Sequence, residues 1–174
     1  PTPPDELKKP SGISPLAAVP DSIGEDARTT WGADLVEYNP FLSHDFLWSL
    51  EESGSATRKT GWLGQHLVLD GPDGRPAAIL PAYLKSHSMG EYVFDQGWAD
   101  AYERAGGRYY PKLQMSVPFT PVTGRRLLVK PGAEAANHRL TLASGVTTLA
   151  RRHGVSSVHA TFLPEDEWTL LGEA

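Results

Sequence analysis

The chain has 174 residues, of which 40% are hydrophobic and 21% charged, and its formal net charge is -5. This length supports one domain with a hydrophobic core, while the negative balance argues against an electrostatic grip on DNA or anionic membranes, which favour clustered Lys and Arg. With no cysteine in the sequence, disulfides, thiolate nucleophiles and thiolate metal sites are excluded.

Targeting signals are also missing from the sequence. No window approaches the run of about 18 apolar residues that a membrane-spanning helix needs. The amino end lacks the charged-then-apolar pattern of a secretory signal. We therefore expect a cytoplasmic protein with no membrane span.

The first predicted segments are an arm and a helix. Prolines at positions 1, 3, 4, 10 and 15 predict a Pro-rich flexible arm over residues 1–20, which leaves 21–174 as the domain. A helix follows residues 39–42, with Ser43 as its N-cap and Gly54 after its end. Its apolar side chains, which should face the core, are Phe46, Leu47 and Leu50.

The middle of the chain predicts strands and a short helix. Residues 65–70 and 77–84 form a β-hairpin around a turn at 71–74, because Gly and Pro concentrate in that turn. A short helix at 98–105 ends at Gly106 and Gly107. Further strands are expected at 112–117 and 126–130.

The last third predicts a helix, a strand and a helix. The first helix covers about 133–153, is stopped by Gly154, and has Leu140, Val146 and Leu149 among its buried positions. Residues 157–163 are apolar enough for an interior strand. Residues 164–167 open the final helix, whose docking side chains are Trp168, Leu170 and Leu171.

This element order predicts the fold class α/β (α+β), a mixed β-sheet flanked by helices. A strand, helix, strand sequence near the end implies a right-handed crossover, so at least part of the sheet is parallel. Because no strand follows the last helix, we expect the sheet to be incomplete at its C-terminal edge. Self-association through that open edge is one possible consequence.

The segment from 83 to 124 mixes charged and aromatic side chains, as a small-molecule cleft does. Carboxylates and aromatic rings favour a cationic substrate amine, whereas cations beside phenols suit a carboxylate or phosphate. No metal is expected, because no second acid or His recurs at ligand spacing. The candidate substrate-binding residues are Lys85, Asp95, Trp98, Tyr110, Lys112 and Thr123, and the candidate catalytic residues are His87 and Glu91.

Structural interpretations stay open beside the functional ones. His87 lies at a polar strand exit, where its side chain could simply be solvated. Glu91 and Asp95 could cap helices or turns, and Tyr109 and Tyr110 could fill space under the following Pro-rich turn. Phosphate-loop, dinucleotide-binding and nucleophile-elbow motifs are absent, which disfavours NTPases, dehydrogenases and hydrolases.

Several separate motifs occur between residue 39 and the C-terminus: Asn-Pro-Phe-Leu-Ser-His at 39–44, Leu-Glu-Glu-Ser-Gly at 50–54, Pro-Ala-Tyr-Leu-Lys-Ser-His-Ser at 81–88, Gly-Glu-Tyr-Val-Phe-Asp at 90–95, Tyr-Tyr-Pro-Lys-Leu at 109–113 and Pro-Phe-Thr-Pro-Val-Thr-Gly at 118–124. Together they resemble the FemAB-like branch of the GNAT acyltransferase superfamily, a group labelled peptidoglycan biosynthesis or recognition proteins. The resemblance implies a GNAT-like mixed sheet. It also implies that this chain is the N-terminal half of a protein with two such halves.

The resemblance further implies transfer of an acyl or aminoacyl group to an amine, with no tightly bound cofactor. The donor would be acyl-CoA or aminoacyl-tRNA, and the acceptor a small molecule or cell-wall precursor. A GNAT domain binds pyrophosphate with closely spaced glycines, but residues 128–133 offer one glycine beside Pro131, which lacks an N–H. We therefore expect this chain to supply mainly the acceptor-side cleft. In that scheme His87 or Glu91 assists deprotonation and Lys112 meets an anionic group. A non-catalytic recognition module that binds a cell-wall precursor or a protein partner is the alternative.

Overall fold

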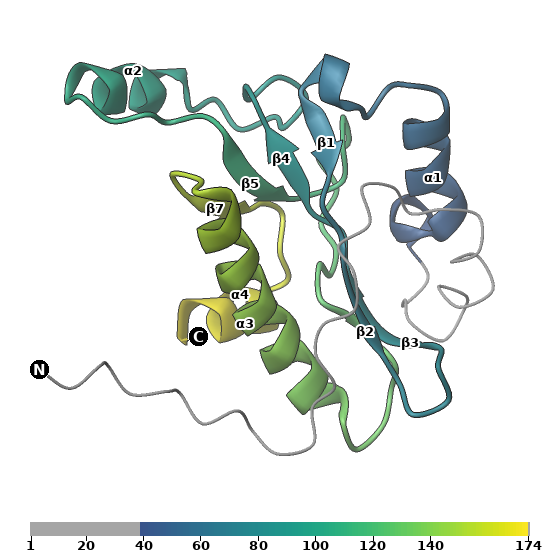
Figure 1. The fold of residues 1–174 in the computed structure, drawn as a ribbon. Helices are drawn as coiled ribbons and strands as arrows, with labels where there is room; N and C mark the ends of the chain where they lie inside the picture. Colours follow the sequence, from purple (N-terminus) through teal and green to yellow (C-terminus); the bar gives the residue numbers. More distant parts are fainter. Residues whose placement is uncertain (1–38, 174) are drawn as a thin grey trace, which may run out of the picture.

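The computed structural model describes residues 39–173, so the arm predicted at 1–20 lies outside the described residues. This part of the chain contains both helices and strands (Figure 1). In order they are η2 (Pro40–Leu42), α1 (His44–Glu52), η3 (Arg58–Thr60), β1 (Trp62–Gly64), β2 (Leu67–Asp70), β3 (Pro76–Leu80), β4 (Tyr83–Lys85), α2 (Gln96–Arg104), β5 (Lys112–Met115), β6 (Leu128–Val129), α3 (Ala135–His153), β7 (Val158–Ala160) and α4 (Glu165–Glu173).

The strands form two sheets, with the orders β1-β4-β5-β7 and β2-β3-β6. Every pairing in them is antiparallel except that of β5 with β7, which is parallel. The predicted parallel part of the sheet is therefore confirmed, but the parallel pair is β5 with β7, because β6, the strand directly before α3, lies in the other sheet. The mixed α+β architecture also confirms the predicted fold class and is consistent with a GNAT-like fold.

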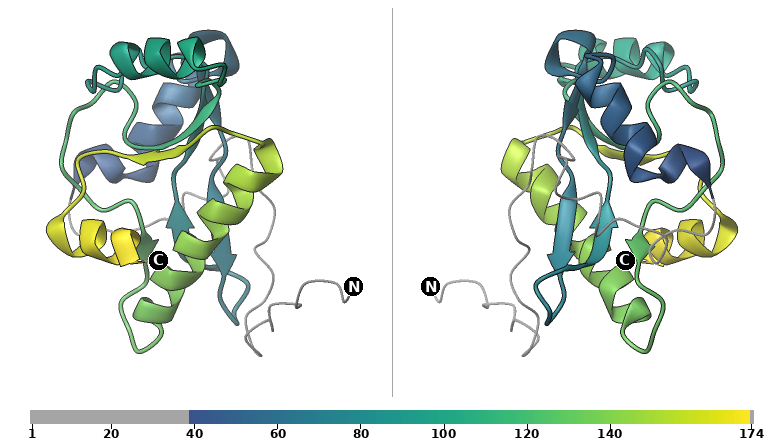
Figure 2. Two further views of the ribbon diagram at one scale, coloured as in Figure 1. Left: turned by 90° about the vertical axis from the view of Figure 1, so that its left-hand side faces the viewer. Right: turned by 90° about the vertical axis from the view of Figure 1, so that its right-hand side faces the viewer.

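Alternation along β3 explains how helices cover both faces of its sheet. Ala78 and Leu80 belong to the main core, where they meet side chains of α3. Ile79, between them, points the other way and joins the cluster that contains Leu47 of α1. Figure 2 shows α1 and α3 on opposite sides of the strands.

Helix α3 confirms the predicted span closely but not every predicted contact. Leu142, Val146 and Leu149 are buried at helical spacing against the sheets. Leu140 was expected in this row, and that prediction is wrong, because its side chain is 52% exposed. Two residues before Leu142 on a helix is about 200° around the axis, so Leu140 lies on the outer flank.

The predicted hairpin is present, but its second strand is shorter than the expected 77–84. β3 pairs with β2 only as far as Leu80, and after Pro81 the chain enters the other sheet as β4. Pro81 has no N–H for a ladder, and the N–H of Ala82 donates to Nδ1 of His66 instead of to a strand partner. β1, which pairs with β4, was not predicted.

The C-terminal region corrects two further expectations. β7 was expected to be an interior strand, yet among the described residues it pairs only with β5, and Val158 is 37% exposed. In α4, Leu170 and Leu171 pack against the core as expected, but Trp168 is 68% exposed. The buried side chain of the first turn is Glu167, because its carboxylate accepts hydrogen bonds from the backbone N–H groups of Arg126 and Leu127.

Candidate functional site

One face of the β1-β4-β5-β7 sheet is polar although it is buried. Lys85 of β4 lies opposite Lys112 of β5, and Tyr83 lies opposite Gln114. All four side chains are fully buried. Leu113, which alternates with Lys112 and Gln114, joins the hydrophobic core on the other face. The sheet therefore presents lysines, a phenol and an amide to a common interior space.

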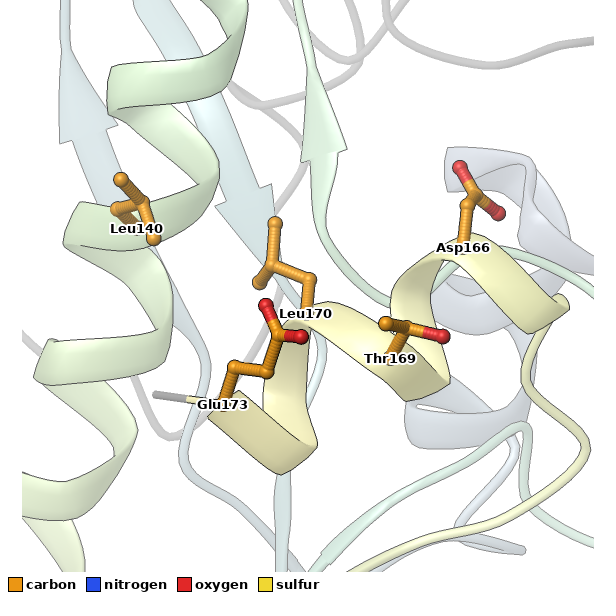
Figure 3. A pocket seen from close by; sticks show the side chains of 5 residues that line it. All are labelled: Leu140, Asp166, Thr169, Leu170 and Glu173. Atoms are coloured by element: carbon orange, nitrogen blue, oxygen red, sulfur yellow. The ribbon is translucent and has the colours of Figure 1, made fainter.

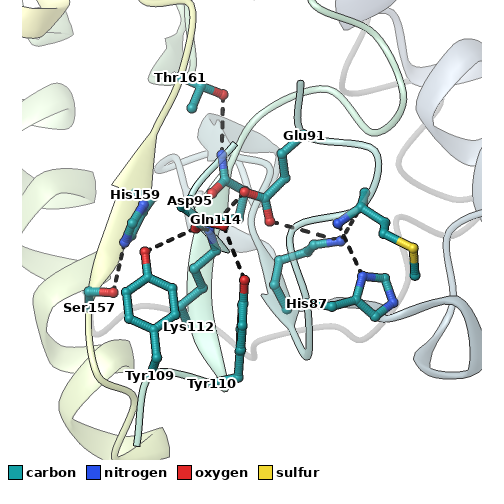
Figure 4. A network of polar contacts seen from close by, with 12 residues as sticks. His87, Glu91, Asp95, Tyr109, Tyr110, Lys112, Gln114, Ser157, His159 and Thr161 are labelled. Atoms are coloured by element: carbon teal, nitrogen blue, oxygen red, sulfur yellow. Dashed lines mark hydrogen bonds and ion pairs between the residues drawn. The ribbon is translucent and has the colours of Figure 1, made fainter. Parts of the chain in front are cut away.

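Two carboxylates from the segment between β4 and α2 neutralise this face (Figure 4). The ammonium group of Lys112 donates to Oε2 of Glu91 at 2.8 Å and to Oδ2 of Asp95. Nζ of Lys85 lies 4.0 Å from Oε1 of Glu91 and donates to the carbonyl of Met89 at 3.1 Å. The four charged side chains are at most 6% exposed, so the ion pairs form in a low-dielectric environment. We call Lys85, Glu91, Asp95 and Lys112 the charge cluster.

Asp95 is the most firmly held carboxylate of the charge cluster. The hydroxyl of Tyr109 donates to Oδ2 at 2.9 Å, and that of Tyr110 donates to Oδ1 at 3.1 Å. Burial alone would raise the pKa of Asp95, but hydrogen bonds from Lys112, Ser88 and Tyr109 outweigh it and lower the pKa to about 2. Asp95 is therefore an ionised, immobile anchor rather than a proton acceptor.

Unlike the pKa of Asp95, the pKa values of Lys85 and Glu91 are shifted so that their neutral forms are favoured. Burial lowers the pKa of Lys85 from its usual 10.5 to about 7, against the opposing pull of Glu91. Burial also raises the pKa of Glu91, although Lys112 opposes the shift. The ammonium group of Lys85 lies 3.4 Å from the centroid of the Trp62 ring, which replaces part of its lost hydration. An acid and a base whose pKa values burial shifts towards each other thus lie side by side.

This shift of Lys85 predicts a pH dependence of stability. Between about pH 7 and 10.5 the unfolded chain binds more protons at Lys85 than the folded chain does, so the free energy of unfolding should rise with pH there. Relative to Lys85→Met, the protein should gain up to about 1.4 kcal/mol per pH unit. Urea unfolding from pH 6.5 to 9.5 measures the difference in free energy of unfolding between the unchanged protein and Lys85→Met. A difference that does not change with pH would contradict the prediction.

The structure brings most of the predicted site residues together. Lys85, Glu91, Asp95 and Lys112 form the charge cluster, and Tyr110 donates to it. His87 borders it half-buried, with Nδ1 accepting from the N–H of Met89 at 3.2 Å, and burial lowers its pKa. His87 and Tyr110 lie in the same network of polar contacts (Figure 4).

Two predicted residues lie outside this arrangement. Trp98 is 76% exposed on α2, which extends away from the sheets in Figure 1. Thr123 is exposed in the loop before β6, and its carbonyl accepts from the side chain of Asn39. Among the described residues, neither side chain makes a hydrogen bond or ion pair with the charge cluster. Helical spacing turns Trp98 outwards, while Ala99 is the buried position of α2.

Sequence reasoning missed the polar residues that complete the buried face. Gln114 donates from Nε2 to Thr161 Oγ1 at 3.2 Å, and His159 Nε2 lies 2.8 Å from Ser157 Oγ. Buried polar atoms without a hydrogen-bond partner include Glu91 Oε1, Gln114 Oε1, Ser116 Oγ and Trp62 Nε1. Alternation of Lys112 and Gln114 along β5, continued by Ser116 directly after the strand, is the signal that could have revealed this face.

Two other features of the described part of the chain bear on the assignment. Within residues 39–173, no three His, Asp or Glu side chains gather as metal ligands would, and no helix is long and apolar enough to cross a membrane. A surface hollow of about 380 Å³ lies between α3 and α4, on different elements from the charge cluster (Figure 3). Its lining residues are Leu140, Asp166, Thr169, Leu170 and Glu173.

Comparison with known proteins gives one match. A family model, FemAB-like, described as peptidoglycan biosynthesis/recognition, matches residues 22–174. No curated protein and no solved structure matches the chain. The matched range contains every residue of the charge cluster.

Proposed function

This chain belongs to the FemAB-like family of peptidoglycan biosynthesis and recognition proteins, and on that basis we propose that it takes part in transferring an activated acyl or aminoacyl group to an amine of a cell-wall precursor. The observation that supports the proposal is the charge cluster, in which Glu91 and Lys85 lie beside each other while burial raises the pKa of Glu91 and lowers that of Lys85. A buried site of this kind can take up the proton that an attacking amine must lose.

In the proposed reaction the amine nitrogen attacks the acyl carbonyl carbon. A C–N bond forms, the ester C–O bond of aminoacyl-tRNA or the thioester C–S bond of acyl-CoA breaks, and the leaving group takes a proton. The amine proton passes to Glu91 or to His87, which burial keeps neutral by lowering its pKa. Lys112 meets an anionic group of the substrate, and Tyr110 lines the acceptor side.

The junction between β6 and α3 supports an acceptor-side role for this chain. A CoA pyrophosphate binds best to free N–H groups at a helix N-terminus. Here Pro131 has no N–H, the N–H of Lys130 donates to the carbonyl of Ala77, and Glu134 occupies the N-cap of α3. A carboxylate at the helix N-terminus repels a phosphate. The donor, aminoacyl-tRNA or acyl-CoA, is therefore proposed to bind outside this junction.

A transfer assay with both donors and an amine-bearing cell-wall precursor tests the proposal. Replacing Glu91 by Gln or His87 by Ala should lower the rate of transfer by about 10²-fold for whichever residue accepts the proton. Glu103→Gln is the matched control, because Glu103 is an exposed carboxylate on α2. Unchanged turnover in both single variants and in the double variant would remove both residues from the mechanism.

A non-catalytic recognition module is the second candidate, and one observation favours it. The side chains of the charge cluster are at most 6% exposed, so a substrate has no direct access to their charged groups in the described conformation. Binding of a cell-wall precursor without transfer from either donor would support recognition. Transfer that depends on Glu91 or His87 would contradict it.

A further inference from the structure

We propose that Lys85 and Lys112 form a subsite for the carboxylate of the acceptor substrate, and that Glu91 occupies this subsite until the substrate carboxylate replaces it. The inference rests on the proposed function, since it names a ligand class for the same site. Glu91 thus serves as an internal stand-in for the substrate.

The first support is the way Glu91 bridges the two lysines. Its Oε2 lies 2.8 Å from Nζ of Lys112, and its Oε1 lies 4.0 Å from Nζ of Lys85. Both lysines are fully buried, so they need an anion between them whenever both are charged. The contact to Lys85 is loose, and Glu91 Oε1 has no hydrogen-bond partner. A carboxylate set slightly differently could satisfy both ammonium groups better.

The second support is the contrast between the two acids of the charge cluster. Asp95 accepts from Tyr109, Tyr110 and Lys112 and stands at the N-terminus of α2. In the described part of the chain, the side chain of Glu91 pairs only with the two lysines. Exchange of Glu91 for another carboxylate therefore breaks two ion pairs and restores two, and Asp95 stays in place.

The third support is the segment that carries Glu91. Residues 86–94 belong to no helix or strand. Within the described residues they make two main-chain hydrogen bonds, from Glu91 N to Ser88 O and from Phe119 N to Gly90 O. Gly90 has φ +82, and a Cβ there would meet the Phe119 ring at 2.6 Å, so this glycine lets the segment lie flat over the cluster. Lifting the segment breaks no sheet ladder, although it also breaks the hydrogen bonds from Lys85 to the carbonyl of Met89 and from Ser88 to Asp95.

The outer side of the same segment is unusually apolar. Met89, Tyr92 and Phe94 are 65%, 55% and 86% exposed. Exposed large apolar side chains in one segment mark a surface that meets a ligand or changes its packing. Lifting of residues 86–94 would move Glu91 out of the charge cluster and change the packing of these side chains. Glu91, once released from the lysines, would be free to accept the proton of the amine.

A carboxylate fits this subsite better than a phosphate does. The present occupant is a planar group with one charge, and replacing it by another keeps the two lysines and two carboxylates in balance. A phosphate ester is tetrahedral and adds charge, so it would leave the buried cluster with an excess of negative charge. A peptide or amino acid with a free carboxylate is therefore the expected ligand class.

NMR titration of the 174-residue chain and of Glu91→Ala with N-acetylglycine tests the inference. The variant should bind this carboxylate at least about tenfold more tightly than the unchanged protein, since the competing internal carboxylate is gone. The neutral N-acetylglycinamide should bind to neither. Adding Lys85→Met to the variant should abolish binding, and Glu103→Ala alone should leave the affinity of the unchanged protein as it is.

The other outcomes are equally decisive. Equal affinity for the acid and the amide, or tighter binding of inorganic phosphate than of N-acetylglycine, would overturn the assignment. If Glu91→Ala fails to fold, Glu91→Gln should show the same gain, and its absence would overturn the proposal too. Binding requires no donor. Retained carboxylate binding without transfer would therefore contradict the proposed reaction alone, and transfer without carboxylate binding would contradict this subsite alone.

Discussion

Replacing Lys112 by methionine should lower the free energy of unfolding by about 3–5 kcal/mol. Methionine fills much of the same volume, but it leaves buried Asp95 without an ammonium partner and buried Glu91 with only its 4.0 Å contact to Lys85. Removing one partner of a buried ion pair costs far more than the pair contributes, because the remaining charge is desolvated and unpaired. Urea unfolding at pH 7, followed by circular dichroism, measures the loss.

Two comparisons separate this effect from a simple change of side chain. Lys59→Met removes an exposed lysine from η3 and should change stability by less than about 0.5 kcal/mol. Lys112→Met combined with Glu91→Gln should recover a large part of the loss, since one orphaned charge disappears. A loss for Lys112→Met no greater than that for Lys59→Met would show that the charge cluster contributes nothing to folding.

Local signals allowed much of the helical structure to be predicted. Ser43 was predicted as the N-cap of α1, and its hydroxyl accepts from the N–H of Phe46 at 3.3 Å. Gly154 was predicted to stop α3, and it adopts the left-handed conformation with φ +60 that ends helices. Helix-capping signals depend on a few neighbouring residues, so they can be recognised from the sequence alone.

Sheet membership was harder to predict, because it depends on distant partners. The apolar run after the hairpin turn gave no sign that the chain changes sheets at Pro81, since β3 and β4 are equally buried. Residues 157–163 looked interior for the same reason, although β7 has one described neighbour. Apolar composition reports burial, whereas strand order is decided by pairing across long sequence separations.

In the candidate site, too, local features could be predicted from the sequence, whereas contacts between distant residues could not. Its mixed composition indicated which segment carries polar chemistry, and Lys85, Glu91, Asp95 and Lys112 do meet. Nothing local indicated that they meet in a buried space, because Lys112 is 17 and 21 residues from its two carboxylate partners. Trp98 was selected as an aromatic in the same segment, yet it faces outwards on α2.

Glu167 shows how a charge can be essential to the fold without belonging to the candidate site. Its Oε2 accepts from the N–H of Arg126 at 2.7 Å and its Oε1 from that of Leu127 at 3.1 Å. The Arg126 guanidinium is also fully buried and donates to backbone carbonyls that include those of Val122, Gly124 and Thr161. This pair ties α4 to the segment that enters β6, so both partners should be sensitive to substitution.

Glu167→Ala is expected to lower the free energy of unfolding by about 3–5 kcal/mol, because it leaves two buried N–H groups without acceptors and removes the carboxylate whose charge favours the buried Arg126 cation. Glu167→Gln should cost much less. Its amide oxygen still accepts one N–H, and burial raises the pKa of Glu167, so a neutral side chain escapes part of the desolvation cost that the carboxylate bears. Glu173→Ala, at an exposed position of the same helix, provides the control. Thermal unfolding of the three variants should therefore give Glu167→Ala a much lower melting temperature than Glu167→Gln. Glu173→Ala should melt close to the unchanged protein. Equal melting temperatures for the two Glu167 variants would mean that the hydrogen bonds to Arg126 and Leu127 do not stabilise the fold.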